Sequence, residues 1–217
     1  MTLSEENYLK TIYHLTSGQN AAVSTNAIAE KIDTKASSVT DMIKKLADKK
    51  LVTYVRYQGV RLTPEGLHAA VMIVRKHRIW EFFLVDKLEF NWDEVHEIAE
   101  QLEHIKSEQL IDRLDAFLGH PAVDPHGDPI PNAEGKINKI PKKLLAEATL
   151  NEVVVCVGVK DSSADFLKYL DKQKIALGTE IQVIGKETFD GSMQIRCNGN
   201  PLTITYKAAS NLYVRQN

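Results

Sequence analysis

Six histidine and glutamate residues between Val74 and Lys106 have the side chains and the spacing of a metal site. They are His77, Glu81, His96, Glu100, Glu103 and His104. The residues of the pairs His77/Glu81 and His96/Glu100 are four apart, so each pair would share one face of a helix. Imidazole and carboxylate ligands suit a borderline divalent ion such as Mn²⁺ or Fe²⁺, and no thiolate lies among them to hold zinc or Cu(I). The pattern therefore predicts a divalent-metal site carried on two helices.

A solvated helix face would produce the same stripe. On a helical projection, the apolar residues of the second helix fall on one side, and His96, Glu100, Glu103 and His104 fall on the other. Continued along the same helix, the apolar residues from Ile111 onward lie on the charged side. A charged face that is covered needs neutralising partners, and a metal ion is one such partner. Spacing alone leaves both interpretations open.

The segment before this stripe has the pattern of a winged helix-turn-helix. Three stretches near 4–15, 24–32 and 37–46 repeat apolar residues at helical spacing. Residues 51–62 form two β-rich runs around Gln58-Gly59, which predicts a hairpin. Hydroxyls at the front of the third helix suit DNA base edges, and the cations behind them suit phosphates, although a helical domain with a basic face would share this pattern. The predicted DNA contacts are Lys35, Ser37, Ser38, Thr40, Lys44, Lys45, Arg56 and Arg61.

The rest of the chain divides into a helical part and a β-rich part. Thr63-Pro64-Glu65 supplies a cap, a proline and an acid at the start of a helix that we expect to reach about Leu88. Asn91 and Glu94 predict the start of the next helix. A proline-rich linker follows at 119–150, and short alternating runs beyond it predict a small β-barrel. We therefore predict a DNA-binding domain at 1–63, a helical domain at 64–141 and a β-barrel domain at 151–217.

Composition is that of a globular protein in a reducing compartment. Of the 217 residues, 43% are hydrophobic and 26% are charged, which is ordinary for a folded domain. The net charge of −2 gives the whole chain no nucleic-acid signature, but residues 35–61 hold seven Lys or Arg against two Asp. Cys156 and Cys197 are too few for a disulfide scaffold. There is no signal-peptide pattern and no apolar run long enough to span a membrane, so we expect a cytoplasmic location.

Seven short motifs spread over the chain resemble one known family, the diphtheria-toxin-repressor and manganese-regulator (DtxR/MntR) family in its three-domain form. They are Tyr8-Leu9-Lys10-Thr11-Ile12-Tyr13, Ser37-Ser38-Val39-Thr40, Leu62-Thr63-Pro64-Glu65-Gly66, Arg75-Lys76-His77-Arg78, Val95-His96-Glu97, Glu103-His104 and Pro125-His126-Gly127-Asp128-Pro129-Ile130-Pro131. The resemblance implies a mainly α fold with a β C-terminal domain. Its parts would be a winged helix-turn-helix, a helical dimerisation and metal-binding domain, and an SH3-like barrel of the FeoA kind.

The resemblance also implies a primary metal site at Asn7, Glu100, Glu103 and His104. Iron-type members have cysteine at the position of Glu100 and manganese-type members have glutamate, so Glu100 favours Mn²⁺. Asn7 stands where the family commonly has Asp or Met, and it offers a neutral carbonyl oxygen. Lys10 replaces an acidic ligand of the two-domain manganese regulators, so we do not expect a closely spaced dinuclear centre.

A second metal site is implied as well. Asp124 stands where some relatives have cysteine, so this site would also lack a thiol. Such a site would fasten the barrel and the proline-rich loop to the helical domain. Its predicted ligands are His77, Glu81, His96, Asp124, His126 and either Asp161 or Asp165.

Taken together, these expectations describe a metal-dependent transcriptional repressor of metal-homeostasis genes. It would bind Mn²⁺, or alternatively Fe²⁺, with up to two ions per chain. It would be a homodimer on a palindromic operator in double-stranded DNA, with no membrane or small-molecule substrate as partner. Metal would join the first helix to the dimerisation domain and order a loose dimer. Its two third helices would then meet successive major grooves about 34 Å apart.

Two other classes of function compete with this one. An enzyme is disfavoured, because His96-Glu97 lacks the second histidine of a zinc-protease helix and the two Glu-x-x-His motifs of a di-iron oxidase are absent. A metal-independent winged-helix regulator stays open, because ion-pair networks also produce His/Glu stripes. Metal-dependent operator binding would distinguish the metal-dependent repressor from this metal-independent regulator.

Overall fold

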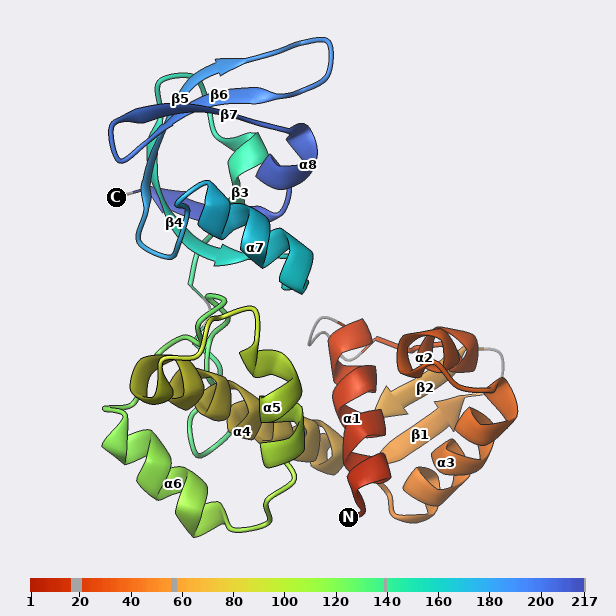
Figure 1. Cartoon of the computed structure of the whole chain (residues 1–217). Coiled ribbons are helices and arrows are strands. Elements are labelled where there is room, and N and C mark those ends of the chain that lie inside the picture. The colour runs from red at the N-terminus through yellow and green to blue at the C-terminus, as the bar shows by residue number, and fades with distance from the viewer. Residues whose placement is uncertain (17–20, 56–57, 139, 217) are drawn as a thin grey trace. The chain divides into compact units, whose positions relative to one another are not determined.

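The structure is a computed structural model that describes residues 1–16, 21–55, 58–138 and 140–216 (Figure 1). The predicted turn at 17–20 and the predicted DNA contact Arg56 lie outside these residues. The chain forms two compact units. The first consists of 1–77, 100–114 and 131–137, and the second consists of 78–99, 115–130 and 138–217. We describe each unit by itself.

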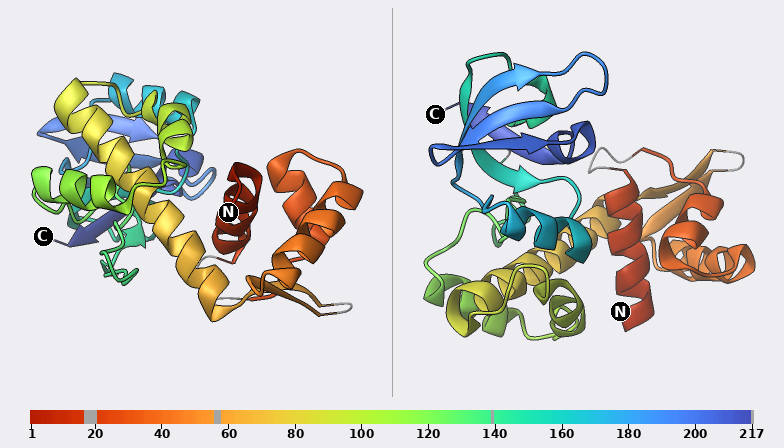
Figure 2. Two further views of the ribbon diagram at one scale, coloured as in Figure 1. Left: turned by 90° about the horizontal axis from the view of Figure 1, so that it is seen from below. Right: turned by 45° about the horizontal axis from the view of Figure 1, so that its top comes forward.

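A winged helix opens the first unit. Its elements are α1 (Leu3–Leu15), α2 (Thr25–Ile32), α3 (Ala36–Asp48), β1 (Val52–Val55) and β2 (Gly59–Leu62). The two strands pair antiparallel, and α3 lies beside them (Figure 2). Leu9, Ile12, Ile28, Val39 and Leu46 are fully buried in the shared core. Their helical spacing is the one on which the sequence prediction rested, and the winged-helix class is confirmed.

Local capping explains where these helices begin. Thr2 and Glu5 form a reciprocal capping box at the start of α1. The Ser24 hydroxyl accepts a hydrogen bond from Ala27 N at 3.1 Å at the start of α2. Helix α3 begins at Ala36, just before the two serines expected to open it, and the side chain of its cap residue Lys35 makes no capping bond. The hydroxyls of Ser37 and Ser38 therefore belong to the exposed first turn of α3.

The six histidine and glutamate residues of the predicted metal stripe lie on or between three helices. These helices are α4 (Pro64–Leu88), α5 (Val95–Leu102) and α6 (Glu108–Phe117). The Thr63 hydroxyl accepts a hydrogen bond from Gly66 N at 3.0 Å, as the predicted cap of α4 requires. The prediction of one continuous helix beyond Val95 is wrong, because α5 ends at Leu102. A new helix, α6, follows, and the Ser107 hydroxyl caps it by accepting a hydrogen bond from Leu110 N. Glu103 and His104 consequently lie in the turn between helices.

An antiparallel sheet forms the C-terminal part of the second unit. Its strand order is β3-β8-β4-β5-β6-β7, and its buried face and the helices enclose one apolar core (Figure 1). The sequence pattern predicts strands at 153–159, 181–185 and 193–197 and a helix at 165–173, which agree with β4, β5, β6 and α7 to within one residue at each end. The pattern at 202–206 places β7 two residues late. It missed β3, η1, α8 and β8, which are short or end in exposed residues. The elements are β3 (Lys143–Leu144), η1 (Leu145–Glu147), β4 (Val153–Val159), α7 (Ala164–Lys172), β5 (Glu180–Lys186), β6 (Met193–Cys197), β7 (Asn200–Ile204), α8 (Tyr206–Ala209) and β8 (Leu212–Gln216).

Among the described residues, no helix is both long and apolar enough to cross a membrane.

Candidate metal centre

Within the first unit, three side chains from separate elements meet. His77 comes from α4, Glu100 from the last turn of α5 and Glu103 from the turn that follows. Each offers a ligand atom within 4.8 Å of the others. His77 Nδ1 lies 2.6 Å from Glu103 Oε2, and Glu103 is fully buried. We call these three residues the Glu103 cluster.

Helix α1 contacts this cluster through charged side chains. The Lys10 ammonium donates to Glu100 Oε1 and also lies 2.7 Å from Glu103 Oε1. One turn earlier, Glu6 Oε2 lies 2.6 Å from His104 Nδ1, and both side chains are largely buried. The first helix of the winged helix is thus tied to the Glu100–His104 segment by two sets of polar contacts.

The charge of Glu103 is stabilised by its neighbours. Burial by itself would raise the pKa of Glu103, but the His77 hydrogen bond and the Lys10 charge outweigh burial, and the pKa is lowered. The carboxylate is therefore anionic at neutral pH. It is thus in the protonation state that a carboxylate ligand of a divalent cation requires.

A second group of side chains lies within the second unit. Glu81 of α4, Asp124 and His126 offer ligand atoms within 4.8 Å of one another, and all three residues are buried. His126 Nδ1 lies 3.6 Å from Glu81 Oε2. Asp124 Oδ1 accepts hydrogen bonds from the backbone N–H of His126 and of Asp128, each at 2.9 Å. We call Glu81, Asp124 and His126 the Glu81 cluster.

Like charges and burial shift the pKa values in the Glu81 cluster. Burial, together with the charges of Glu81 and Asp128, raises the pKa of Asp124 to about 7, although Arg78 opposes the shift. Burial would lower the pKa of His126, but Glu81 and Asp124 raise it to about 9. Two carboxylates this close disfavour each other's charge unless a cation lies between them. A protonated histidine partly fills that role here.

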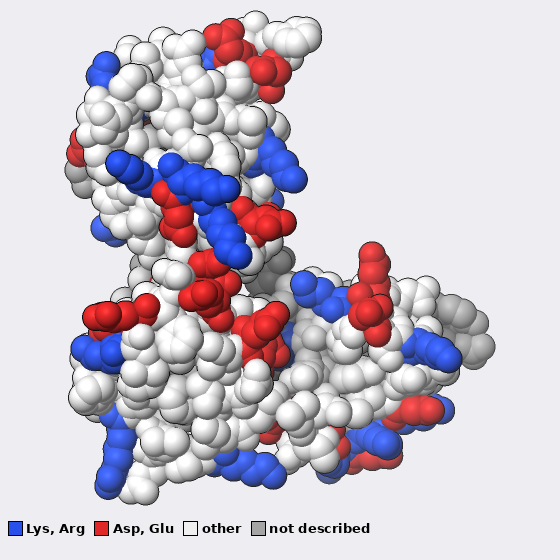
Figure 3. Space-filling view, in the orientation of Figure 1, with Lys and Arg blue, Asp and Glu red and all other residues white. Residues whose placement is uncertain are grey.

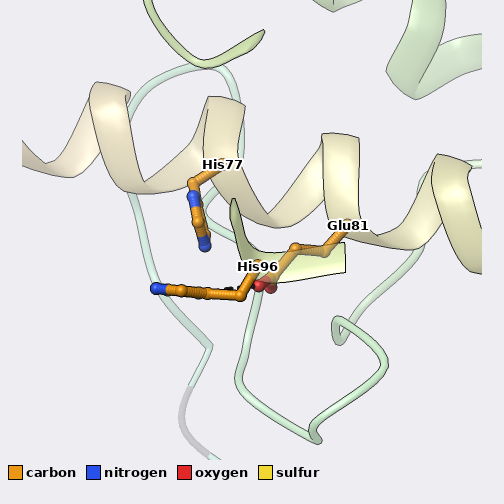
Figure 4. Close-up of side chains that lie close together, drawn as sticks. All are labelled: His77, Glu81 and His96. Atoms are coloured by element: carbon orange, nitrogen blue, oxygen red, sulfur yellow. Dashed lines mark hydrogen bonds and ion pairs between the residues drawn. The ribbon is translucent and has the colours of Figure 1, made fainter. Parts of the chain in front are cut away.

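His96 extends the set toward solvent. Its Nδ1 lies 3.3 Å from Glu81 Oε1, and its side chain is 57% exposed. Figure 4 shows Glu81 and His96 approaching each other, with His77 one turn earlier on the same face of α4. The predicted i, i+4 pairing of His77 and Glu81 on one helix face is thus present.

Two predicted ligands take other positions. Asp161 Oδ1 accepts a hydrogen bond from Ser163 N at 2.9 Å, next to the start of α7. Asp165 is exposed in the first turn of that helix. Neither belongs to any group of potential metal ligands found among the described residues. Both assignments stay predictions that rest on the resemblance.

The side chains present fit a hard or borderline divalent cation. Both clusters consist of imidazole and carboxylate groups, while Cys156 and Cys197 are buried in the core of the sheet. Asn7 Oδ1 is buried and has no hydrogen-bond partner among the described residues. A buried carbonyl oxygen without a partner is costly, and a cation would compensate it.

All the predicted DNA contacts that the structure describes are exposed. Lys35, Ser37, Ser38, Thr40, Lys44 and Lys45 are exposed on or next to α3, and Arg61 is exposed on β2. Thr40 Oγ1 donates to Ala36 O at 3.0 Å, which leaves its lone pairs available to an outside donor. Lysine and arginine side chains alternate with acidic ones on the face drawn in Figure 3. Lys44, for example, lies 3.4 Å from Asp41.

Three residues that the sequence prediction left out of the sites contact the clusters or the adjacent His104. Glu6 pairs with His104, Lys10 pairs with Glu100 and Glu103, and Arg78 Nε lies 3.4 Å from Asp124 Oδ2. Glu6 and Lys10 are four residues apart and share one face of α1, where both are buried. That spacing marks them as a pair of neighbouring charged residues, but it does not identify their distant partners.

Comparisons with known proteins cover nearly the whole chain. Residues 1–60 match the iron-dependent repressor N-terminal DNA-binding domain. Residues 63–132 match the metal-binding and dimerisation domain of iron-dependent repressors, and residues 143–216 match the FeoA domain. These are the three parts expected of the three-domain form.

Individual relatives of known type also match this chain. The iron-dependent repressor IdeR of Mycobacterium tuberculosis is 34% identical over 126 residues, 58% of this chain, and the match spans only about half (54%) of that protein. A manganese-dependent transcriptional repressor in complex with manganese is 35% identical with a TM-score of 0.86, covering 98% of this chain and all of the other. The manganese regulator SloR is also 35% identical, with a TM-score of 0.76 and full coverage of both chains.

These relatives are named as metal-dependent repressors or regulators of transcription, and the two solved structures match nearly the whole of this chain. The chain therefore belongs to the diphtheria-toxin-repressor family of metal-dependent transcriptional repressors.

Proposed function

We propose that this chain is a manganese-dependent, homodimeric repressor that binds a palindromic operator in double-stranded DNA and controls metal-homeostasis genes. The observation that supports this proposal most directly is the set of contacts between α1 and the Glu103 cluster. Lys10 joins α1 to Glu100 and Glu103, and Glu6 joins it to His104. A change at the cluster therefore reaches the first helix of the winged helix through direct contacts.

The core of the winged helix passes such a change to the DNA-reading surface. Leu9 and Ile12 of α1 are fully buried in the same core as Val39 of α3. Because packed cores shift between discrete arrangements rather than deforming gradually, a displaced α1 carries α3 with it. In this proposal the predicted primary ligands Asn7, Glu100, Glu103 and His104 hold the ion. His77, which the sequence analysis assigned to the second site, joins them because it lies with Glu100 and Glu103.

When bound, the divalent cation supplies positive charge that neutralises the carboxylates and draws their segments together. Its effect on DNA affinity is limited to its preference for the DNA-binding arrangement, typically about 1–3 kcal/mol per effector.

Manganese is the preferred metal in this proposal because of the ligand atoms. Glu100 supplies a carboxylate at a position where softer metals would favour a thiolate. Two of the structural relatives carry manganese in their names, whereas IdeR is named for iron. Fe²⁺ is therefore the alternative effector. A Glu100→Cys variant should shift the preference toward Fe²⁺ or Co²⁺.

We propose a second ion for each chain at the Glu81 cluster, with His96 at its edge. Its three buried residues hold two carboxylates and an imidazole that already disturb one another's protonation. A second binding event would tie the loop at 121–131 to α4. The proposed stoichiometry is up to two ions per chain.

The proposed dimer would use the helical part. The matching family model there is described as a metal-binding and dimerisation domain. Leu88 and Phe117 are 52% and 67% exposed on the second unit, and large exposed apolar side chains favour a protein–protein contact. We retain 1–63, 64–141 and 151–217 as the proposed domains and the cytoplasm as the proposed location of a DNA-binding regulator.

The experiment that tests the proposal is an anaerobic titration of Mn²⁺ and of Fe²⁺ against binding to DNA from the gene's own promoter. Wild type should bind the promoter only when metal is added. His104→Ala should lose this activation and keep its circular dichroism spectrum, because His104 is a ligand and not a core side chain. His68→Ala, an exposed change on α4, is the matched control. Normal Mn²⁺ activation of His104→Ala would refute the primary-site assignment.

One observation favours a second candidate, a winged-helix regulator without metal. The Lys10, Glu100 and Glu103 ion pairs already neutralise the buried carboxylates. Such a protein would bind its promoter equally well in the presence of a chelator and in the presence of Mn²⁺.

A further inference from the structure

The Lys10 side chain lies where a divalent cation would contact the Glu103 cluster. Its ammonium group is in contact with Glu100 Oε1 and within 2.7 and 2.8 Å of the two Glu103 carboxylate oxygens. The Lys10 side chain is only 10% exposed. Two of the three cluster residues thus direct their carboxylates at one tethered positive charge.

We propose that Lys10 is a built-in competitor for the divalent cation at Glu100 and Glu103, and that it sets the metal concentration at which the protein responds. This inference rests on the function proposed above. The carboxylate oxygens that hold the ammonium are the oxygens a metal ion would need. An ion and the ammonium cannot both contact them closely, because two cations at such short separation repel each other. Lys10 therefore has to withdraw before the ion is fully bound.

The size of the effect follows from the population of the withdrawn arrangement. The apparent dissociation constant is the intrinsic value divided by the fraction of molecules that are competent to bind. If Lys10 is withdrawn in roughly one molecule in ten, apparent affinity falls about tenfold. The tethered Lys10 charge would thus prevent weakly binding cations from occupying the cluster. A tightly binding cation would displace it.

The position of Lys10 also links this competition to DNA reading. Lys10 directly follows the buried Leu9 on α1. Leu9 packs in the same hydrophobic core as residues of α3. Exchange of the ammonium for a metal ion replaces one set of contacts between α1 and the Glu100–His104 segment with another. The competitor and the effector consequently act on the same helix.

The test is Mn²⁺ binding by calorimetry to the full-length wild type and to Lys10→Met, which keeps the length of the side chain and removes its charge. Lys49→Met is the matched control. Lys49 makes a similar ion pair with Glu5 at 2.7 Å, and neither residue belongs to the Glu103 cluster. We expect Lys10→Met to bind Mn²⁺ at its tighter site at least tenfold more strongly than wild type, and Lys49→Met to bind like wild type. Equal or weaker binding by Lys10→Met would overturn the proposal.

A measurement on wild type covers the case in which Lys10→Met does not fold. Acetylation of lysine amines, read by mass spectrometry, should modify Lys10 slowly without metal and several-fold faster in saturating Mn²⁺. Unchanged or slower modification of Lys10 in Mn²⁺ would contradict its displacement. Lys49 should be modified at the same rate in both conditions.

The outcomes also separate this proposal from the proposed function. If wild type binds Mn²⁺ and Lys10→Met gains nothing, the competitor is refuted and the metal-dependent repressor stands. If neither protein binds Mn²⁺, both proposals fail. If Lys10→Met binds Mn²⁺ and wild type does not, the proposal that Lys10 competes with the metal ion is supported in its strongest form.

Discussion

The ring of His126 and the backbone of Trp92 are joined by a hydrogen bond of 2.8 Å from His126 Nε2 to the Trp92 carbonyl oxygen. A carbonyl oxygen only accepts, so Nε2 carries a proton and Nδ1 is the atom that lies toward Glu81. The two rings are also stacked, with centroids 6.2 Å apart. Trp92 Nε1 in turn donates to Asp171 of α7 at 3.0 Å. One histidine therefore links the Glu81 cluster to the C-terminal sheet domain.

His126→Ala is expected to remove the second ion without affecting the first. The stoichiometry of Mn²⁺ binding should fall from two ions to one per chain, because an imidazole ligand is lost from the Glu81 cluster. Limited proteolysis near residues 140–150 should become faster, because the loop loses its contacts with Glu81 and Trp92. His120→Ala, an exposed change in the same part of the chain, should alter neither result. A single ion per wild-type chain in saturating Mn²⁺ would rule out the second site.

Gly127→Ala is expected to loosen the same loop by a steric route. The φ angle of Gly127 is +84°, and an added Cβ would lie 2.1 Å from the Val157 carbonyl oxygen. Gly119 offers a matched control, with a φ of +75° and nothing within 4 Å of an added Cβ. Both alanine variants carry the backbone penalty, but only Gly127→Ala meets a clash. Its free energy of unfolding should be lower than that of Gly119→Ala by at least about 1 kcal/mol. Equal values for the two variants would contradict the packing of this loop on β4.

Cations on α3 are expected to govern the salt dependence of DNA binding. Lys44→Ala or Lys45→Ala should weaken binding to all DNA sequences alike and reduce the slope of log affinity against log salt by about 1. Thr40→Ala should change sequence preference instead. Lys172→Ala, a change at the end of α7, is the control for a lost surface charge. If both α3 lysine variants match wild type at every salt concentration, α3 is not the DNA-binding helix.

Glu152 is expected to stabilise the C-terminal domain in a pH-dependent way. Hydrogen bonds from Lys143, at 2.7 and 2.9 Å, and from Thr149 N lower the pKa of Glu152 to about 2, compared with an ordinary value of 4.5. A lowered folded-state pKa gives stability that is present above the unfolded-state value and is lost as pH falls toward 2. Glu152→Gln should therefore lower the urea midpoint at pH 6 and make a smaller difference at pH 3. A difference from wild type that grows on acidification would refute this assignment.

Local patterns in the sequence determined most of the fold. Apolar spacing placed the buried residues of α1, α2 and α3, and Thr63-Pro64-Glu65 marked the start of α4, because caps and helix periodicity depend only on near neighbours. The His77/Glu81 pair on one face of α4 follows from the same local geometry. The family motifs and the matching domains agree with these local predictions.

Tertiary structure decided how the clusters are composed and where the second helix ends. Helix α5 stops at Leu102, so Glu103 reaches His77 from a turn and His104 reaches Glu6. The approach of Lys10 to Glu100 joins residues 90 positions apart. Spacing along one helix cannot predict these contacts, because they depend on how α1 packs against a distant segment. Sequence by itself indicated which residue types could bind a metal ion. Only the packing of separate elements determined which of them share a site and that the Lys10 ammonium already lies against Glu100 and Glu103.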